Sequence, residues 1–191
     1  MKKLIIALLL FPCFAFAQYD AVSEVGLPIK DGLVVYERVV DVKGMKKSDI
    51  YAASKKWITD NFNSSKRVIQ TEDYDAGQLI GDGSTTAKVS EKNRYNKIEF
   101  KLQINCKDEK YRIRFYQMNI TAVTSGVLTV DLRKTNSTIP LETLAFVPKD
   151  RKFSEKDIEK VKTSNKYLND HFTLLLNSFN NSVRSSTNDD F

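Results

Sequence analysis

The chain has 191 residues, a net charge of +6 at neutral pH, one histidine and two cysteines. A chain of this length can bury the core of a single domain, and so small a charge excess does not indicate nucleic acid as a partner. One histidine and two cysteines are too few for a zinc site, so we expect no metal centre of that kind and no bound cofactor.

Residues 1–17 have the pattern of a cleavable secretory signal. Two lysines precede the apolar run "LIIALLLFPCFAF", and small residues precede the cleavage expected between Ala17 and Gln18. A membrane anchor needs about 20 apolar residues, and this run is shorter. A lipoprotein anchor on Cys13 is a further alternative, which Pro12 disfavours because such signals place a small residue there. We expect an exported protein, periplasmic or secreted, with no transmembrane segment after signal removal.

The first half of the mature chain reads as a lead-in, a strand and a helix. Residues 18–31 lack periodicity and are expected to form a flexible lead-in. The run "GLVVYERVVDV", residues 32–42, is rich in β-branched residues, and its apolar residues on both faces predict a central strand. Residues 48–62 switch to helical spacing, with Ser48 as the expected N-cap.

The stretch "QTEDYDAGQLIGDGST" contains three aspartates and three glycines. An EF-hand loop starting at Asp73 would put glycine and glutamine where a ligand and the turn glycine belong, and a phosphate loop needs a helix after its glycines. We therefore predict a hairpin loop from Asp75 to Gly77, with Gly77 left-handed, and keep a weak metal site as the alternative. Gly81 and Gly83 are expected to mark a bulge, a bend or a close backbone approach.

Residues 98–118 predict a second hairpin. Pairing Cys106 with Tyr111 across the four-residue turn "KDEK" places the apolar residues of both strands on one face. The other face then carries a polar, basic strip, which we treat as a candidate binding face: Lys101, Gln103, Arg112, Arg114 and Tyr116. A solvated sheet face with no ligand is the alternative reading of the same residues.

The C-terminal third is expected to contain a long connection and a long helix. Residues 134–153 include two prolines and read as the connection. Ser154 with Asp157 resembles a capping box, and the amphipathic helix that follows, interrupted at Asn165, should lie on the core face of the sheet. Residues 32–185 then form one α+β domain, and residues 186–191 form a frayed tail.

No residue pattern indicates catalysis. His171 lies beside the apolar stripe of the long helix and is expected to pack there half-buried. Cys106 points to the core face as a structural thiol, and Trp57 is expected in the core. Nucleophile motifs such as Gly-x-Ser-x-Gly do not occur. We therefore predict no catalytic residues.

Four segments together resemble an uncharacterised family of exported bacterial proteins, common in Bacteroidota, that is described as having a TATA-binding-protein-like (TBP-like) fold. The segments are "GLVVYERVVDVKG", "IYAASKKWI", "VIQTEDYDAGQLIGDG" and "IEFKLQINCKDEKYRIRF", within about residues 32–118. The matching features are Trp57 on its helix, the hairpin with Asp73 and Gly77, and the turn that starts at Cys106. The resemblance implies a curved antiparallel sheet backed by helices. It implies no activity, because the family has none assigned, and a shared shape does not transfer DNA binding.

Together these observations predict an α+β fold, with a curved antiparallel sheet, a helix after the first strand and a long C-terminal helix on one face. The expected function is that of a non-catalytic binding or interaction module of the cell envelope, whose ligand or partner protein the sequence does not identify. An envelope hydrolase of unrecognised type is the alternative.

Overall fold

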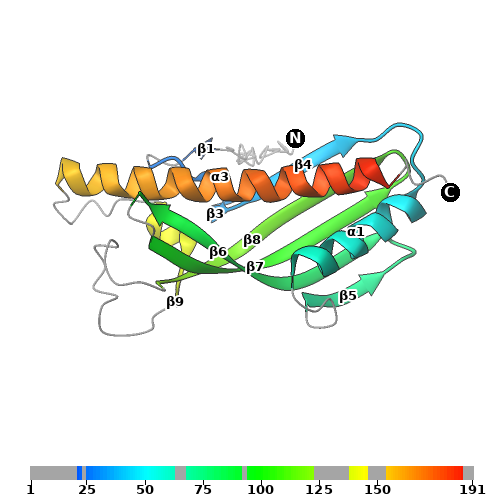
Figure 1. Cartoon of the computed structure of the whole chain (residues 1–191), viewed down its shortest axis with the longest axis horizontal. Helices are drawn as coiled ribbons and strands as arrows, with labels where there is room; N and C mark the ends of the chain where they lie inside the picture. Colours follow the sequence, from blue (N-terminus) through cyan, green and yellow to red (C-terminus); the bar gives the residue numbers. More distant parts are fainter. Residues whose placement is uncertain are drawn as a thin grey trace, which may run out of the picture.

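The computed structural model describes residues 21–22, 25–62, 68–91, 94–122, 138–145 and 154–186. One antiparallel sheet, with the order β4-β8-β7-β6-β5 and β9 paired to β8, carries both helices on one face (Figure 1). Its strands are β4 (Tyr36–Asp41), β5 (Ile69–Asp73), β6 (Gln78–Ser90), β7 (Arg94–Lys107), β8 (Lys110–Ala122) and β9 (Thr138–Pro140), and the helices are α1 (Lys47–Asn61) and α3 (Glu155–Ser185). The predicted α+β architecture is confirmed. The signal segment 1–17 lies outside the described residues.

The β7–β8 hairpin has the predicted register. Cys106 is opposite Tyr111, and Lys101 is opposite Tyr116, so one face of both strands is apolar and buried. The turn is tighter than expected, because Lys107 already pairs with Lys110. The register also shifts between Glu99 and Lys101, which marks a β-bulge that alternation alone does not reveal.

The expected central strand at residues 32–42 is wrong in its position and its continuity. The strand is interrupted at Val35, whose N–H donates to the carbonyl of Pro28 at 3.2 Å. Residues before the break form β3 (Leu33–Val34) in a small sheet with β1 (Ala21–Val22) and β2 (Pro28–Lys30), and residues after it form β4 at the edge of the main sheet. The apolar residues on both faces of this stretch have different roles. Val34 is buried in the small sheet, whereas Val39 of the edge strand β4 is 55% exposed.

Residues 25–31 belong to the folded domain, which corrects the expected flexible lead-in. Val25 and Leu27 are buried in the core. Two asparagines of α3 hold this segment, since the Asn165 amide donates to the Val25 carbonyl at 3.0 Å and the Asn169 amide donates to the Gly26 carbonyl at 2.8 Å. Asn165, which interrupts the apolar stripe in the sequence, is fully buried, and its amide nitrogen satisfies this backbone group, whereas its Oδ1 has no partner among the described residues.

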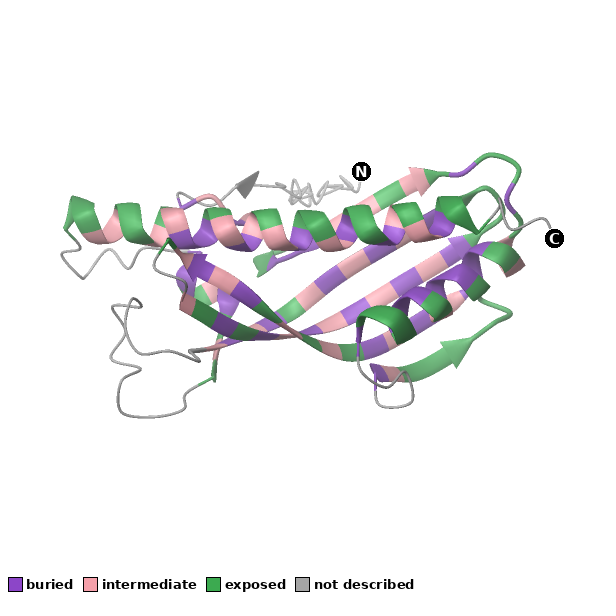
Figure 2. Ribbon diagram, viewed as in Figure 1, coloured by how far each residue is buried: buried purple, intermediate pink, exposed green. Residues whose placement is uncertain are grey.

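The core lies between α3, α1 and the sheet, where the buried faces of the helices meet the alternating buried residues of the strands (Figure 2). Phe172 of α3 stacks on Tyr36 at 4.6 Å between ring centroids and lies 5.4 Å from Phe115. Trp57 is buried as predicted, and its indole N–H donates to Ser178 of α3 at 3.0 Å. The predicted cap of α3 is confirmed, because the Ser154 hydroxyl accepts the N–H of Asp157.

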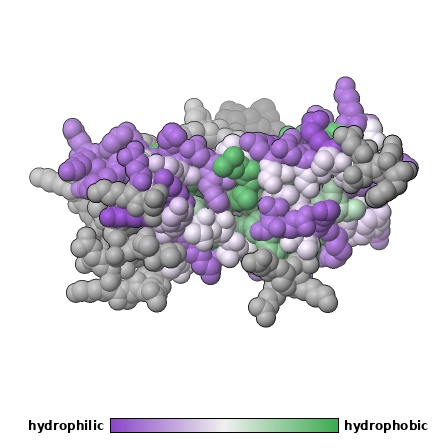
Figure 3. All heavy atoms as spheres, viewed as in Figure 1, coloured by the Kyte–Doolittle hydropathy of each residue, from purple (hydrophilic) through white to green (hydrophobic). Residues whose placement is uncertain are grey.

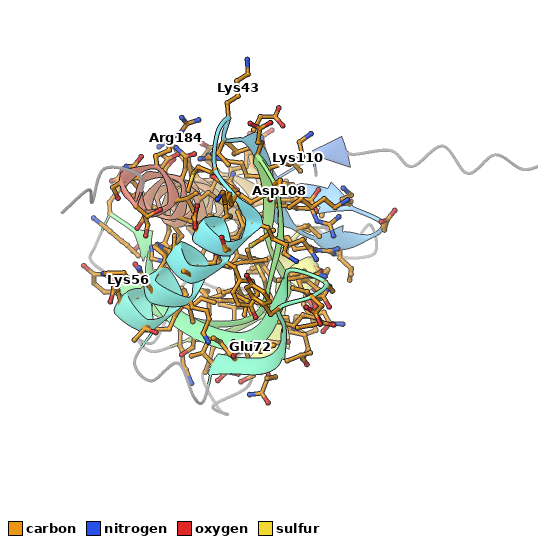
Figure 4. The ribbon with its side chains drawn as sticks, turned by 90° about the vertical axis from the view of Figure 1, so that its right-hand side faces the viewer. Lys43, Lys56, Glu72, Asp108, Lys110 and Arg184 are labelled. Atoms are coloured by element: carbon orange, nitrogen blue, oxygen red, sulfur yellow. The ribbon has the colours of Figure 1, made fainter. Side chains whose placement is uncertain are left out.

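Ser48 is not the cap of the first helix. The helix α1 begins at Lys47, and the N-cap residue Lys46 makes no side-chain hydrogen bond to it. The Asp108 carboxylate accepts the Lys47 N–H at 2.7 Å instead, and Asp108 lies beside the start of α1 at the tip of the β7–β8 hairpin (Figure 4). The capping group therefore comes from a residue that is distant in sequence.

The Asp- and Gly-rich stretch forms a hairpin turn as predicted, but the loop runs from Tyr74 to Gly77 and is one residue longer than expected, because Asp73 pairs with Gln78. Gly77 has φ +64°, and its N–H donates to the Tyr74 carbonyl at 3.0 Å. A Cβ at Gly77 would lie 2.2 Å from the Cys106 carbonyl oxygen, and one at Gly81 would lie 2.1 Å from that of Val68. Both positions require glycine because two backbones approach closely. No cluster of metal-ligating side chains occurs within the described ranges.

The connection at 134–153 contains regular structure, since it includes β9 and a 3-10 helix, η2 (Leu141–Leu144), whose leucines are buried. Residues 123–137 and 146–153 lie outside the described part. The same is true of the tail after Ser186.

Candidate functional site

The five residues of the predicted binding face lie side by side on β7 and β8. They occupy the sheet face opposite the helices, which we call the outer face, because their strand neighbours Leu102, Ile113 and Phe115 point into the core. The register also places Gln103 opposite Arg114, and Asn105 opposite Arg112. The outer face therefore gathers these polar side chains as their alternation predicts.

Three lysines of the outer face are paired with carboxylates, whereas Lys107, at the hairpin end opposite Lys110, has no ion pair in the described chain. Lys101 lies 3.0 Å from Asp82 of β6. At the two ends of the hairpin, Lys97 pairs with Glu99 at 2.7 Å and Lys110 pairs with Asp41 at 3.0 Å. These pairs are exposed and contribute little stability. They do reduce the positive field that the sequence alone suggests for this strip.

The two arginines have neutral partners. The Arg112 guanidinium donates to the Asn105 amide oxygen at 2.9 Å, and the Arg114 guanidinium lies 4.5 Å from the centroid of the Tyr116 ring. Neither arginine forms an ion pair with a carboxylate in the part of the chain that the structure describes. A guanidinium has five N–H donors, so both retain donors for a further acceptor.

Glu37 of β4 is the acidic neighbour of this pair, directly opposite Arg114. Its carboxylate is bound by Lys30 at 2.9 Å, so Lys30 neutralises Glu37 and the charges of the two arginines remain. One Glu37 oxygen, Oε2, and the Arg114 Nε are both buried without a hydrogen-bond partner in the described chain. A buried polar atom without a partner costs free energy, which marks Arg114 as a functional candidate.

Glu37 and Asp82 are further members of this face that the sequence alone does not identify. Both carry the outward parity of their strands, but their strands could be placed beside β8 and β7 only once the strand order was known. The alternation within a strand predicts which face a side chain lies on, whereas the sequence does not predict which strands are neighbours in the sheet.

The residues expected to pack do so. Cys106 is buried, and burial raises the pKa of its thiol to about 11, which keeps it protonated and unreactive. Burial also lowers the pKa of His171. Its Nε2 lies 2.9 Å from the Thr85 hydroxyl, and its ring meets that of Phe172 edge-on. No carboxylate orients this imidazole among the described residues, so the contact has only two of the three groups of a nucleophile–base–orienter arrangement.

Residues 36–121 match the family described as "Domain of unknown function (DUF4468) with TBP-like fold". The chain therefore carries a DUF4468 domain, which spans β4 to β8, and the resemblance inferred from its motifs is confirmed. No functionally curated protein matches the chain. None of the helices in the described ranges combines the length and apolar character that a membrane span requires.

Two crystal structures share the fold. A TBP-like protein from Parabacteroides distasonis ATCC 8503 has a TM-score of 0.57 and 15% identity, and the match covers 81% of this chain and 97% of that one. A DUF4468 family protein from Bacteroides ovatus ATCC 8483 has a TM-score of 0.57 and 16% identity, covering 80% of this chain and 90% of that one. At such identities the likeness establishes the fold alone.

Proposed function

We propose that the protein is a non-catalytic binding module whose outer face holds a carboxylate-bearing partner on Arg112 and Arg114. The observation that carries the proposal is the difference between the cations of this face. Lys97, Lys101 and Lys110 are ion-paired, whereas the two arginines are held by an amide and an aromatic ring. The planar guanidinium fork matches a carboxylate in a bidentate manner, which a lysine cannot do.

The surroundings of the pair suit such a partner. Asn105 and Tyr116 fix the two guanidinium groups, so less side-chain entropy is lost when a ligand binds. Gln103 lies opposite Arg114 and adds an amide that can accept or donate. Val39 lies opposite Arg112 on the edge strand and offers an exposed apolar contact beside the charges.

Binding of poly-L-glutamate at low ionic strength, measured by calorimetry, tests the proposal. Hydrogen bonds to charged groups contribute about 1.5–3 kcal/mol each, so the double variant Arg112→Gln/Arg114→Gln should bind at least about tenfold more weakly. The matched control Lys97→Gln/Lys110→Gln loses the same two charges from ion-paired positions of the same hairpin. An equal loss in both variants would mean that only net charge matters, and would overturn the proposal.

We also propose that the module acts outside the cytoplasm, as the segment 1–17 suggests. Intact-mass analysis of the protein expressed in its full length in a Gram-negative host tests this. The mature chain should begin at Gln18. A chain that retains Met1 and stays in the cytoplasmic fraction would contradict export.

A further inference from the structure

A cavity of about 600 Å³ lies at the edge of the outer face, beyond Lys101 from the arginine pair. Asn61 and Phe62 at the C-terminal end of α1 form one wall, and the middle of β6, β7 and β8 forms the rest. A volume of this size is typical of small-ligand sites. In the view of Figure 1, the molecular surface is mostly hydrophilic, with a small hydrophobic patch near its centre (Figure 3).

A β-bulge shapes this cavity. Glu99 pairs with Asn119 and Lys101 pairs with Tyr116, so Gln117 and Met118 together oppose Phe100. Met118 is fully buried, and Gln117 lines the cavity. Gln117 has φ +49°, a conformation that a residue with a side chain rarely adopts. Strain of this kind occurs preferentially at functional sites, and bulges commonly re-aim a side chain there.

Gly83 keeps the cavity open on the β6 side. It lies opposite Phe100, and a Cβ at Gly83 would lie 2.5 Å from the Phe100 ring. β5 begins at Ile69, which pairs with Gly81, so the part of β6 after Gly81 has no strand neighbour on that side in the described chain. Because Gly83 has no side chain, the cavity extends past it from the outer face to Asn61 and Phe62 at the end of α1.

The charges of the cavity cancel. Asp82 is paired with Lys101, and Glu99 is paired with Lys97. The remaining polar groups are neutral. The side chains of Gln117, Asn119 and Ser84 make no hydrogen bond within the described ranges, and the Asn61 amide nitrogen is used by the Trp57 carbonyl while its oxygen is not. Amides and hydroxyls both donate and accept, as sugar hydroxyls do.

We propose that this cavity is a binding site for a neutral polyhydroxylated ligand, such as a sugar unit of an uncharged glycan. Neutral hydrogen-bonding groups line this cavity beside the largely buried Phe62 and Phe100, and they suit a ligand that carries many hydroxyls. An ionic ligand would have to compete with an existing ion pair, because each charged group of the cavity already has its partner. The site is independent of the arginine pair, and neither proposal requires the other.

An array of immobilised neutral oligosaccharides built from glucose, galactose, mannose and N-acetylglucosamine tests the proposal. Wild-type protein should bind members of the array. Gln117→Gly, which keeps the backbone conformation and removes the amide, should weaken binding at least tenfold, as should Asn119→Ala. Gln103→Ala, an amide removed from the same face outside the cavity, should leave binding unchanged, and so should Arg112→Gln/Arg114→Gln.

The proposal would be overturned by no binding to any neutral glycan, by equal binding of Gln117→Gly, or by loss of binding in the arginine double variant, which would move the ligand to the arginine pair. Binding of an extended peptide along the free edge of β6, without glycan binding, would also overturn it. Thermal unfolding of Gln117→Gly separates loss of the ligand contact from loss of the fold, since glycine relieves the strained φ and the variant should be at least as stable as wild type.

Discussion

The carboxylate of Asp108 accepts a hydrogen bond from the backbone N–H of Lys47, at 2.7 Å. This contact joins the tip of the β7–β8 hairpin to the first residue of α1. Glu109 reinforces it, because its N–H donates to the Met45 carbonyl and its side chain accepts from the Gly44 N–H, both at 2.8 Å. The hairpin that carries the outer-face arginines is thereby fixed to the helix layer behind it.

Replacing Asp108 by alanine should destabilise the protein by about 1 kcal/mol, the usual cost of losing an N-cap. Ser48→Ala is the matched control, because the sequence suggests Ser48 as the cap, whereas its hydroxyl donates only to Asp49. Urea unfolding of both variants gives the two free energies. A larger loss for Ser48→Ala would contradict the capping role of Asp108.

Gly77→Ala should destabilise the protein more than Gly44→Ala. Both glycines have positive φ, and alanine in that region costs about 1–2 kcal/mol. At Gly44 the space around the added Cβ is empty, whereas at Gly77 the Cβ meets the Cys106 carbonyl oxygen at 2.2 Å. Thermal unfolding measures both. Equal losses would show that the backbone approach at Gly77 relaxes without cost.

The register of the β7–β8 hairpin could be predicted because strict alternation admits one pairing that satisfies both faces. The edge position of β4 could not, because the apolar residues of "GLVVYERVVDV" serve two sheets that the chain joins at Val35. The packing of residues 25–31 into the domain could not be predicted either, since it depends on Asn165 and Asn169, more than a hundred residues later in the chain.

Phe172→Ala should cost about 3–5 kcal/mol, because a fully buried aromatic side chain is removed from the centre of the core. Leu174→Ala on the same helix is the control. Its side chain is 66% exposed, so the variant should stay within about 0.5 kcal/mol of wild type. Urea unfolding compares the two. A stable Phe172→Ala variant would mean that α3 does not depend on this contact with the sheet.

Stability should fall as the pH drops below the ordinary histidine pKa of 6.5. Burial lowers the pKa of His171 in the folded state, so the unfolded chain binds the proton first and acid favours unfolding. His171 is the only histidine, and carboxylates titrate lower, near pH 4. Urea unfolding at about pH 7.5 and 5.5 measures the effect. The His171→Gln variant should lose most of this difference in unfolding free energy between the two pH values. An unchanged pH dependence in that variant would mean that other groups cause the difference.

The candidate site was predictable in its members and not in its electrostatics. Alternation alone places Lys101, Arg112 and Arg114 on one face. Which cations stay without a carboxylate depends on Asp82 and Glu37 from other strands, and on Lys30 from the small sheet. The bulge at Gln117 has no sequence signal, because the positive φ falls on a residue that seldom adopts it.

The most direct measurement of the central claim is the NMR spectrum of the arginine side-chain Nε–H groups during titration with poly-L-glutamate. The signals of Arg112 and Arg114 should shift and saturate together, because one ligand engages both guanidinium groups. Arg38, which donates to Asn177 on the helix side of the sheet, serves as the internal reference and should not move. Shifts of equal size at all three arginines, or none at Arg112 and Arg114, would contradict a carboxylate-binding outer face.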